Sequence, residues 1–377
     1  MADYYYWSGA TGANDGSSEA DAWTDLTTAL SGLTAGSTLY LKSPTDGSRD
    51  TFTASYVNLY IIGTVDTMTV FEGYKDTPGD GEPYLGAGSL RSPSTNNDSI
   101  IIKYLDIENT NGNYQPFNIG GCILYRCKAN AVLGSNMHAA YMGDGACIVD
   151  CTLIASTTSN PVARINRGFC VNSYIEQNGD GDGLNIEVGY RAGTATGNVI
   201  VTKSATNTGS GIYFSGTNNI GNGASALNNT IVGFANGINI GNGIGAGSYN
   251  QLINYGNIIS DCGYGIVNSQ STHVTENSVS AYSNAFYNTT SSNYLNIATK
   301  GQVDDVQLTA SPFEDTTYYQ VNDTSGGGDL IKGLLGAPNI VDGPTFENRK
   351  SFNTHGGVVP SPFGSGGGST AEYVTVF

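Results

Sequence analysis

Residues 256–268, GNIISDCGYGIVN, hold two short apolar segments separated by a small polar turn. Gly256 and Asn257 precede the first segment, and Gly263 and Gly265 flank the start of the second. Taken alone, this stretch could be a single hairpin. The same arrangement recurs along the chain, and an internal repeat of this kind decides the fold.

Seven segments align with the first half of this stretch, and each is predicted to be a short strand with alternating inward and outward residues. Cys127, Cys151 and Ser173 take the same position in the first three segments, and Val199, Thr230, Ile258 and Ser278 take it in the rest. The aligned segments are LYRCKANA (124–131), IVDCTLIA (148–155), CVNSYIEQ (170–177), GNVIVTKS (197–204), NNTIVGFA (228–235), GNIISDCG (256–263) and ENSVSAYS (276–283).

A second strand is predicted after a polar turn in the later units. Gly or Asn in that turn tolerates positive φ. The second strands are SGIYFSG (210–216), NGINIGN (236–242), YGIVNSQ (264–270) and NAFYNTT (284–290). Residues 178–197 are predicted to be an insertion at a turn.

A stack of such coils is a parallel β-helix, because one coil cannot bury its inward side chains alone. Like residues then form ladders along the stack. We predict that Cys127 and Cys151 are reduced core thiols on adjacent coils. Asn198, Asn229, Asn257 and Asn277 are predicted to form an amide ladder at matching turns.

Each end of a stack needs a cap. Trp23, Leu26, Leu30 and Leu33 recur at helical spacing, which predicts a short helix near residues 24–33. The predicted organisation is an N-terminal cap of strand, helix and strand (1–50), β-helix coils (51–300), a C-terminal cap region (301–363), and a Gly/Ser linker with a terminal strand (364–377).

The opening stretch, YYYWSGATGANDGSSEADAWTDLTTALSGLTAGSTLYLKS (4–43), resembles that of right-handed parallel β-helix proteins of the pectate-lyase-like superfamily. Residues 308–338, LTASPFEDTTYYQVNDTSGGGDLIKGLLGAP, are similar to the closing segment of uncharacterised phage and bacterial β-helix proteins. The resemblance implies an all-β fold: a right-handed, single-stranded parallel β-helix with an N-terminal capping helix and a Gly-rich C-terminal tail.

The formal net charge is −17, and only 12% of the residues are charged. This balance argues against nucleic acid and against anionic membrane surfaces as partners, because both attract Lys and Arg. The six cysteines form no Cys-x-x-Cys pair and there are three histidines, so a zinc site is not expected. We see no signal peptide at the N-terminus and no run of 18 apolar residues.

The resemblance implies two kinds of site: clustered carboxylates that bind calcium in lyases, or several aspartates with Gly-His-Gly and Arg-Ile-Lys motifs in hydrolases. Asp180 and Asp182, followed by Glu187, are the candidate calcium ligands, because calcium takes six or more oxygens. The alternative is that these aspartates only shape a Gly-rich turn. No other cofactor is predicted.

The hydrolase motifs are incomplete. Arg164 and Asn166 stand in RIN, where Asn166 replaces the basic residue, and His355 lies in half of a Gly-His-Gly motif. Asp304 and Asp305 would face opposite sides of a strand. We therefore find no complete catalytic constellation and assign no catalytic residue.

The C-terminal stretch changes character. SGGGST (365–370) is typical of a flexible linker, and EYVTVF (372–377) alternates like a strand. Tyr373, Val374, Val376 and Phe377 are the candidate partner-binding residues, added to a neighbour's sheet edge. The alternative is that this segment folds back on its own stack.

Three functions follow from these observations. We favour a non-enzymatic structural protein of a virus particle, such as a capsid decoration, fibre or spike of a tailed phage, assembled in the host cytoplasm. Its expected partners are other virion proteins or copies of itself, with a homotrimer and a bound surface glycan as options. The alternatives are a polysaccharide lyase or hydrolase and a bacterial surface adhesin.

Overall fold

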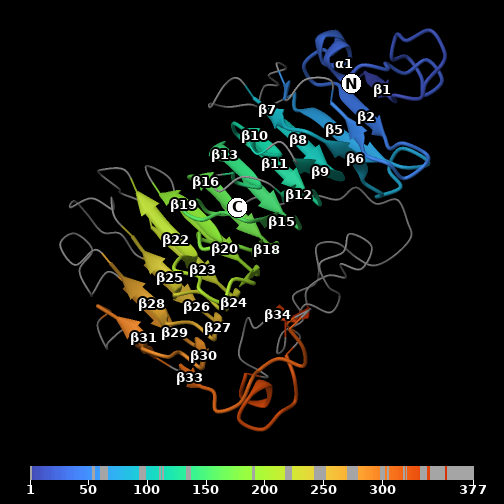
Figure 1. Ribbon diagram of the computed structural model, residues 1–377. Helices are drawn as coiled ribbons and strands as arrows, with labels where there is room; N and C mark the ends of the chain where they lie inside the picture. The colour runs from blue at the N-terminus through green and yellow to red at the C-terminus, as the bar shows by residue number, and fades with distance from the viewer. Residues whose placement is uncertain are drawn as a thin grey trace.

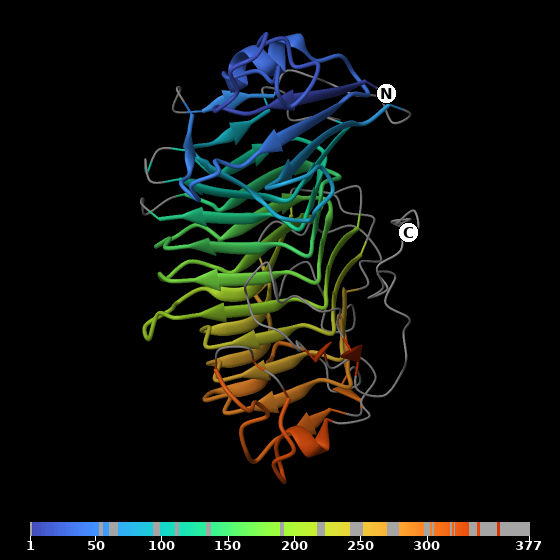
Figure 2. The ribbon, with the colours of Figure 1, turned by 90° about the vertical axis from the view of Figure 1, so that its right-hand side faces the viewer.

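A computed structural model describes residues 2–331, except 53–55, 60–66, 93–98, 110–111, 113, 133–136, 189–191, 217–222, 242–251, 270–278, 298–301, 304, 317–318 and 320, and also residues 338–339 and 353–354. Three long sheets of parallel strands wind about one axis and form a rod (Figures 1 and 2). We call the three sheets A, B and C, and in each coil the chain passes through sheet C, then sheet A, then sheet B. The predicted right-handed parallel β-helix is confirmed.

Strands of successive coils lie side by side in each sheet. Sheet A contains β1 (Asp3–Tyr6), β2 (Thr38–Lys42), β5 (Thr69–Tyr74), β8 (Ile100–Lys103), β11 (Cys122–Tyr125), β14 (Cys147–Val149), β17 (Phe169–Val171), β20 (Gly193–Thr196), β23 (Ala224–Leu227), β26 (Leu252–Tyr255), β29 (Val279–Tyr282) and β32 (Gln302–Val303). Sheet B contains β3 (Asp50–Thr51), β6 (Tyr84–Ala87), β9 (Leu105–Asn109), β12 (Lys128–Ala131), β15 (Thr152–Ala155), β18 (Tyr174–Gln177), β21 (Val199–Thr202), β24 (Thr230–Val232), β27 (Ile258–Ser260), β30 (Ala285–Tyr287) and β33 (Val306–Gln307). Sheet C contains β4 (Val57–Asn58), β7 (Leu90–Arg91), β10 (Phe117–Ile119), β13 (Ala140–Asp144), β16 (Ala163–Asn166), β19 (Leu184–Val188), β22 (Ser210–Gly216), β25 (Asn236–Ile240), β28 (Tyr264–Asn268) and β31 (Ser292–Leu295).

The core is built by strand alternation. In sheet A the register aligns Ile102 with Leu124, and Leu124 with Ile148; all three are fully buried. The residues on either side of each point outward and are more exposed. Stacking therefore buries one continuous apolar column, which no single coil could bury.

A second column, the turn ladder, follows the bend between sheets A and B. The backbone N–H of each ladder residue donates to the side chain of the next: Cys127 to Cys151 Sγ (3.4 Å), Cys151 to Ser173 Oγ (3.1 Å), and Ser173 to Asn198 Oδ1 (2.9 Å). The same bond continues through Asn198, Asn229, Asn257 and Asn284 to Asp305 at 2.7–3.1 Å. One ladder thus ties eight coils together.

The residue before each ladder position from Cys127 to Asn284 has a left-handed backbone, which makes the bend sharp. Gly197 (φ 64°) and Gly256 (φ 65°) adopt it freely, whereas Arg126 (φ 48°) and Asp150 (φ 53°) adopt it as non-glycine residues. This conformation turns the chain from sheet A to sheet B within about one residue.

The sequence alignment was wrong at several positions. After Ser173 the equivalent position in the next three coils is taken by Asn198, Asn229 and Asn257. The alignment had placed it one residue later in each coil, at Val199, Thr230 and Ile258. The fourth amide is Asn284 rather than Asn277, which lies outside the described residues. The ENSVSAYS segment belongs to sheet A, because β29 pairs with β26, and NAFYNTT supplies β30 of sheet B. Unequal loop lengths between coils shifted the alignment.

Two further expectations need correction. Three of the aligned segments are not single strands: LYRCKANA, IVDCTLIA and CVNSYIEQ each hold the end of a sheet A strand, the bend and a sheet B strand. Residues 178–197 are not an insertion, because they contain β19 and β20, which pair in register with their neighbours. The high glycine content of this stretch led to the prediction of a loop, although LNIEV (184–188) alternates as a strand does.

The N-terminal end is covered by the predicted helix, α1 (Leu26–Gly32). Asp25 caps it by accepting the Thr28 N–H at 2.7 Å, and Leu26, Ala29 and Leu30 are buried. The chain before it covers β1, because Tyr5 N–H donates to Gly16 and Trp23 N–H donates to Tyr5. The first strand edge is therefore closed.

The C-terminal segment lies on the outside of sheet B. The later strands of this sheet point Val199, Val201 and Ile258 outward, yet these are 0–1% exposed. They form a second apolar cluster with residues of segment 308–331, which includes the short 3-10 helix η3 (Gly328–Leu330): Leu308, Phe313, Tyr319, Val321 and Ile331. An antiparallel pair, β34 (Pro338–Asn339) and β35 (Asn353–Thr354), follows.

All six cysteines are buried free thiols, and Cys127 and Cys151 stack on adjacent coils as predicted. Burial raises the pKa of the Cys262 thiol to about 12 and raises that of Cys127 well above its usual value. These groups act as small core side chains. Within the described ranges, no helix has the length and apolar character needed to cross a membrane.

Candidate functional site

The outward face of sheet C carries a column of polar and aromatic side chains. The register aligns Asn118, Tyr141, Arg164, Asn185, Tyr213 and Asn239 on six successive strands. Alternation places them outward, because Met142, Ile165 and Ile186 take the inward positions and are fully buried. Strand pairing therefore gathers side chains that lie far apart in the sequence.

Beside this column, Asp144, Asn166 and Glu187 lie in one row on β13, β16 and β19. We call these three residues, with Arg164 and Arg167, the sheet C row. Arg164 Nη2 lies 2.7 Å from Glu187 Oε2, and Arg167 Nε lies 2.7 Å from Asp144 Oδ1. Each carboxylate is therefore ion-paired with an arginine, and the pair of Arg164 and Glu187 is also a hydrogen bond.

Three polar atoms of the sheet C row are buried without a hydrogen-bond partner in the described part of the chain: Arg164 Nε, Asn166 Oδ1 and Asp144 Oδ1, the last of which lies in the ion pair with Arg167. A buried polar atom without a partner costs free energy unless water or a ligand satisfies it. The Arg164 guanidinium also lies 5.4 Å from the centre of the Tyr141 ring. One donor, one acceptor and an aromatic ring thus lie on the same outward face of β13 and β16, which suits a ligand with hydroxyl groups.

His138 borders the sheet C row. Its Nδ1 lies 2.6 Å from the Pro161 carbonyl, and its ring centre lies 5.4 Å from that of Tyr141. Burial, with a smaller contribution from Arg164, lowers the pKa of His138. The imidazole is therefore neutral at physiological pH and acts as a structural neighbour.

The predicted calcium ligands point in different directions. Asp180 accepts the Ser204 hydroxyl at 2.8 Å, and Asp182 accepts the Ser210 N–H at 2.7 Å. Burial raises the pKa of Asp182 to about 6, although the bond from Ser210 opposes this shift. Glu187 belongs to the sheet C row. Among the described residues no group of three or more His, Cys, Asp or Glu side chains could hold a metal ion. Calcium at Asp180 and Asp182 stays a prediction.

The other sequence candidates separate as well. Asp305 ends the turn ladder and also accepts the Tyr294 hydroxyl, so it is structural. Asp304, His273, His355 and all four candidate partner-binding residues of the tail lie outside the described residues. The prediction that the tail binds a neighbour stays a prediction.

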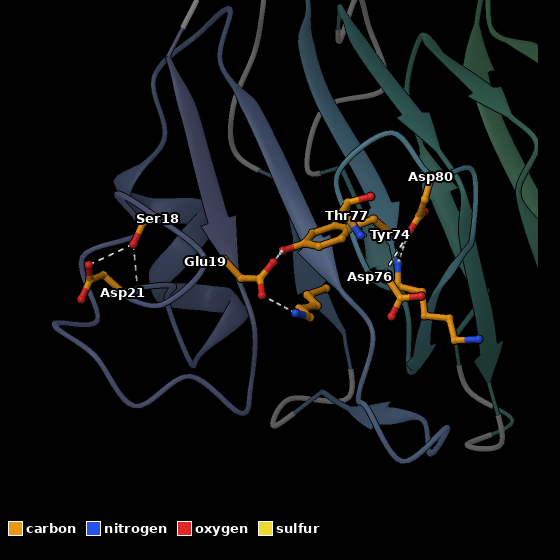
Figure 3. Close-up of polar contacts among 9 residues, drawn as sticks. Ser18, Glu19, Asp21, Tyr74, Asp76, Thr77 and Asp80 are labelled. Carbon is orange, nitrogen blue, oxygen red and sulfur yellow. Dashed lines mark hydrogen bonds and ion pairs between the residues drawn. The ribbon is translucent and has the colours of Figure 1, made fainter. Parts of the chain in front are cut away.

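Sequence reasoning missed a polar cluster on the N-terminal coils (Figure 3). The Glu19 carboxylate accepts the Tyr74 hydroxyl at 3.1 Å and pairs with Lys42, whose Nζ lies 4.7 Å from the centre of the Trp7 ring. Nearby, Asp80 Oδ2 accepts three backbone N–H groups of its own loop. These contacts fasten loops to the stack, and no spacing in the sequence announces them.

Sequence reasoning also passed over Asp144 and the ion pair that it forms with Arg167. Both flank bends in the chain, and only the pairing of β13 with β16 brings them together. The one signal present was RIN, whose Arg164 and Asn166 do lie on the same outward face.

Comparison with known proteins agrees with the fold. A crystal structure of pectate lyase Pel9A superposes with a TM-score of 0.61 over 86% of each chain, at 14% sequence identity. The chain therefore has a parallel β-helix of pectate-lyase-like fold. No protein-family model matches it, and no curated protein matches it. At this identity the likeness concerns the fold alone.

Proposed function

We propose that this protein is a non-enzymatic structural component of a virus particle, and that its sheet C row binds a surface glycan. The observation that carries the glycan assignment is the pair of unpartnered buried atoms, Arg164 Nε and Asn166 Oδ1, beside the Tyr141 ring. Glycan hydroxyls both donate and accept, and sugar rings pack on aromatic faces. The outward columns of Asn and Tyr continue this surface along the rod.

The two ion pairs support binding without catalysis. Glycoside hydrolysis needs one carboxyl group as general acid and a second, free carboxylate as base or nucleophile. Asp144 and Glu187 are each ion-paired with an arginine, so neither carboxylate is unpaired. The pairs hold the row in shape instead.

The rod itself supports a structural role. Sheet A has 12 strands, which at a strand spacing of about 4.8 Å give a length of about 50 Å. The turn ladder bonds coil to coil, a helix covers the N-terminal end, and segment 308–331 covers the outside of sheet B. Such a rod suits a subunit in contact with other particle proteins or with copies of itself.

The enzyme alternative has one observation in its favour. Asp144 and Glu187 are two strands apart, so their backbones are separated by about 10 Å, near the spacing of two carboxyl groups in inverting glycosidases. On this alternative the arginines would exchange partners when substrate binds.

Two measurements test the proposal. Mass spectrometry of purified virus particles from the native source should find the protein in stoichiometric amounts. In parallel, Asn166→Ala should weaken retention on a glycan array, whereas Asn130→Ala, an outward amide on sheet B, should not. Binding without release of reducing ends or unsaturated sugars is the expected result. Absence from the particles would overturn the structural role. Cleavage that Asp144→Asn or Glu187→Gln abolishes would establish the enzyme instead.

A further inference from the structure

An apolar patch lies on the outward face of sheet A, away from the sheet C row. Outward positions of a sheet are normally polar when water covers them. On β8, β11, β14 and β17 the register forms two outward rows. One row is apolar on all four strands, and the other, which begins with Lys103 and Tyr125, is apolar on β14 and β17. We call the following residues the sheet A patch: Ile101, Ile123, Cys147, Phe169, Val149 and Val171.

The sheet A patch is only half-covered. Ile123, Val149 and Phe169 are each partly exposed, and none belongs to either buried apolar cluster. At its rim Lys103 pairs with Glu72 at 2.7 Å and Arg126 pairs with Asp150 at 3.6 Å. The rim charges are thus balanced, and the patch suits an apolar, weakly charged occupant.

The molecule shows elsewhere what happens to such a face. The outward residues Val199, Val201 and Ile258 of sheet B are also apolar, and segment 308–331 of the same chain packs with them in one cluster. Sheet C, whose outward face is polar, has no corresponding cluster among the described residues. On sheet B the apolar outward face is thus covered by the chain's own C-terminal part.

We propose that the terminal segment EYVTVF (372–377) docks on the sheet A patch of its own chain. Residues 355–377 contain one acidic side chain, Glu372, and no Lys or Arg. A second copy as the occupant would instead bring together two chains of net charge −17. The short tether raises the local concentration of the segment at its own patch.

The dimensions fit this assignment. Thr354 in β35 precedes the tail, and its partner β34 lies level with the later coils (Figures 1 and 2). The 17 residues between Thr354 and Glu372, as a Gly-rich coil, span about 23 Å on average and far more when extended. Six extended residues cover about 20 Å, which matches four strands spaced about 4.8 Å apart.

The test measures whether the tail shields the patch. Val149→Cys places a reactive thiol in the patch, and Asn239→Cys places a control thiol on sheet C. Cys147 belongs to the patch and is replaced by Ala in every variant, and the other five native thiols are buried, so they report unfolding. Replacing Tyr373, Val374, Val376 and Phe377 by Ser should speed maleimide labelling of the patch thiol about tenfold and leave the control thiol unchanged. Dilution should change neither rate.

A second variant keeps the test decisive if the serine tail perturbs folding. Ile123→Lys with Phe169→Lys should release the tail and speed proteolysis within residues 365–377, whereas Tyr213→Lys on sheet C should not. Equal labelling with and without the apolar tail would overturn the proposal. So would protection that disappears on dilution, which would indicate a second copy as the occupant.

Discussion

The two halves of the turn ladder use different chemistry for the same task. In the amide half, Asn229 accepts the N–H of Asn198 at 3.0 Å and donates to the Ala195 carbonyl at 3.0 Å and to Asn257 at 3.0 Å. In the thiol half, Cys151 accepts the N–H of Cys127 at 3.4 Å and donates at 3.5 Å to the Leu124 carbonyl.

The difference teaches what the slot requires. An amide is both donor and acceptor, so each Asn bonds to the coil before it and to the coil after it. A thiol is a weak donor and a weak acceptor, so it mainly fills space. The fold tolerates either group, but the amide half should be the more strongly cross-linked part of the rod.

The largest expected effect follows from Asn229→Ala. The change leaves the buried N–H of Asn198 and the Ala195 carbonyl without their partner, which should cost about 3 kcal/mol of unfolding free energy. Urea unfolding followed by circular dichroism measures this loss. A loss below about 1 kcal/mol would show that the amide half gains little from its bonds.

The second effect depends on pH and concerns Asp182. This residue follows Ser173, the ladder position at which the thiol half and the amide half of the turn ladder meet. Its pKa of about 6 in the fold is above its usual value of 3.8, so the fold favours the neutral carboxyl. The stability from this shift is complete below pH 3.8 and is lost as the pH rises through about 6.

Asp182→Asn cannot ionise and still offers an oxygen to the Ser210 N–H. It should therefore be about 2 kcal/mol more stable than the natural chain at pH 8 and nearly equal to it at pH 4. Thermal unfolding at both pH values checks this difference, and added calcium tests the predicted site at once. If added calcium stabilises the natural chain but not Asp182→Asn, the predicted calcium site is supported. If Asp182→Asn is less stable than the natural chain at pH 8, the raised pKa of Asp182 is contradicted.

A smaller effect is expected in the thiol half. Cys151→Ala removes a weak acceptor and leaves a small cavity, which should cost about 1 to 1.5 kcal/mol. The same urea titration applies. If this loss equals that of Asn229→Ala, the distinction between the halves is wrong.

The smallest effect is the control on amides in general. Asn239 points outward on sheet C and accepts the Ser269 hydroxyl at 2.8 Å. Asn239→Ala should change the unfolding free energy by less than about 0.5 kcal/mol, because the site is solvated. If Asn239→Ala lowers the unfolding free energy as much as Asn229→Ala does, the burial of Asn229 is not the cause of its effect.

The sequence alone predicted the fold class, the capping helix and three amides of the ladder, Asn198, Asn229 and Asn257. It could do so because inward positions repeat in every coil, and repeated packing leaves a repeated pattern. It misplaced the fourth amide, because the loop before β29 differs in length from its counterparts and nothing local marks Asn284. The sequence also drew attention to RIN (164–166) but did not show which other residues lie beside Arg164 and Asn166.

Only the tertiary structure decided which side chains meet. Asp144 and Glu187 are far apart in the chain, and the pairing of β13, β16 and β19 sets them on either side of Asn166. The covered face of sheet B and the half-covered patch of sheet A were equally invisible, since an apolar outward residue looks like an inward one in a sequence. The physical reason is that alternation along a strand determines which residues of that strand lie on the same face. The lengths of the connections between strands determine which strands pair, and therefore which residues of different coils become neighbours.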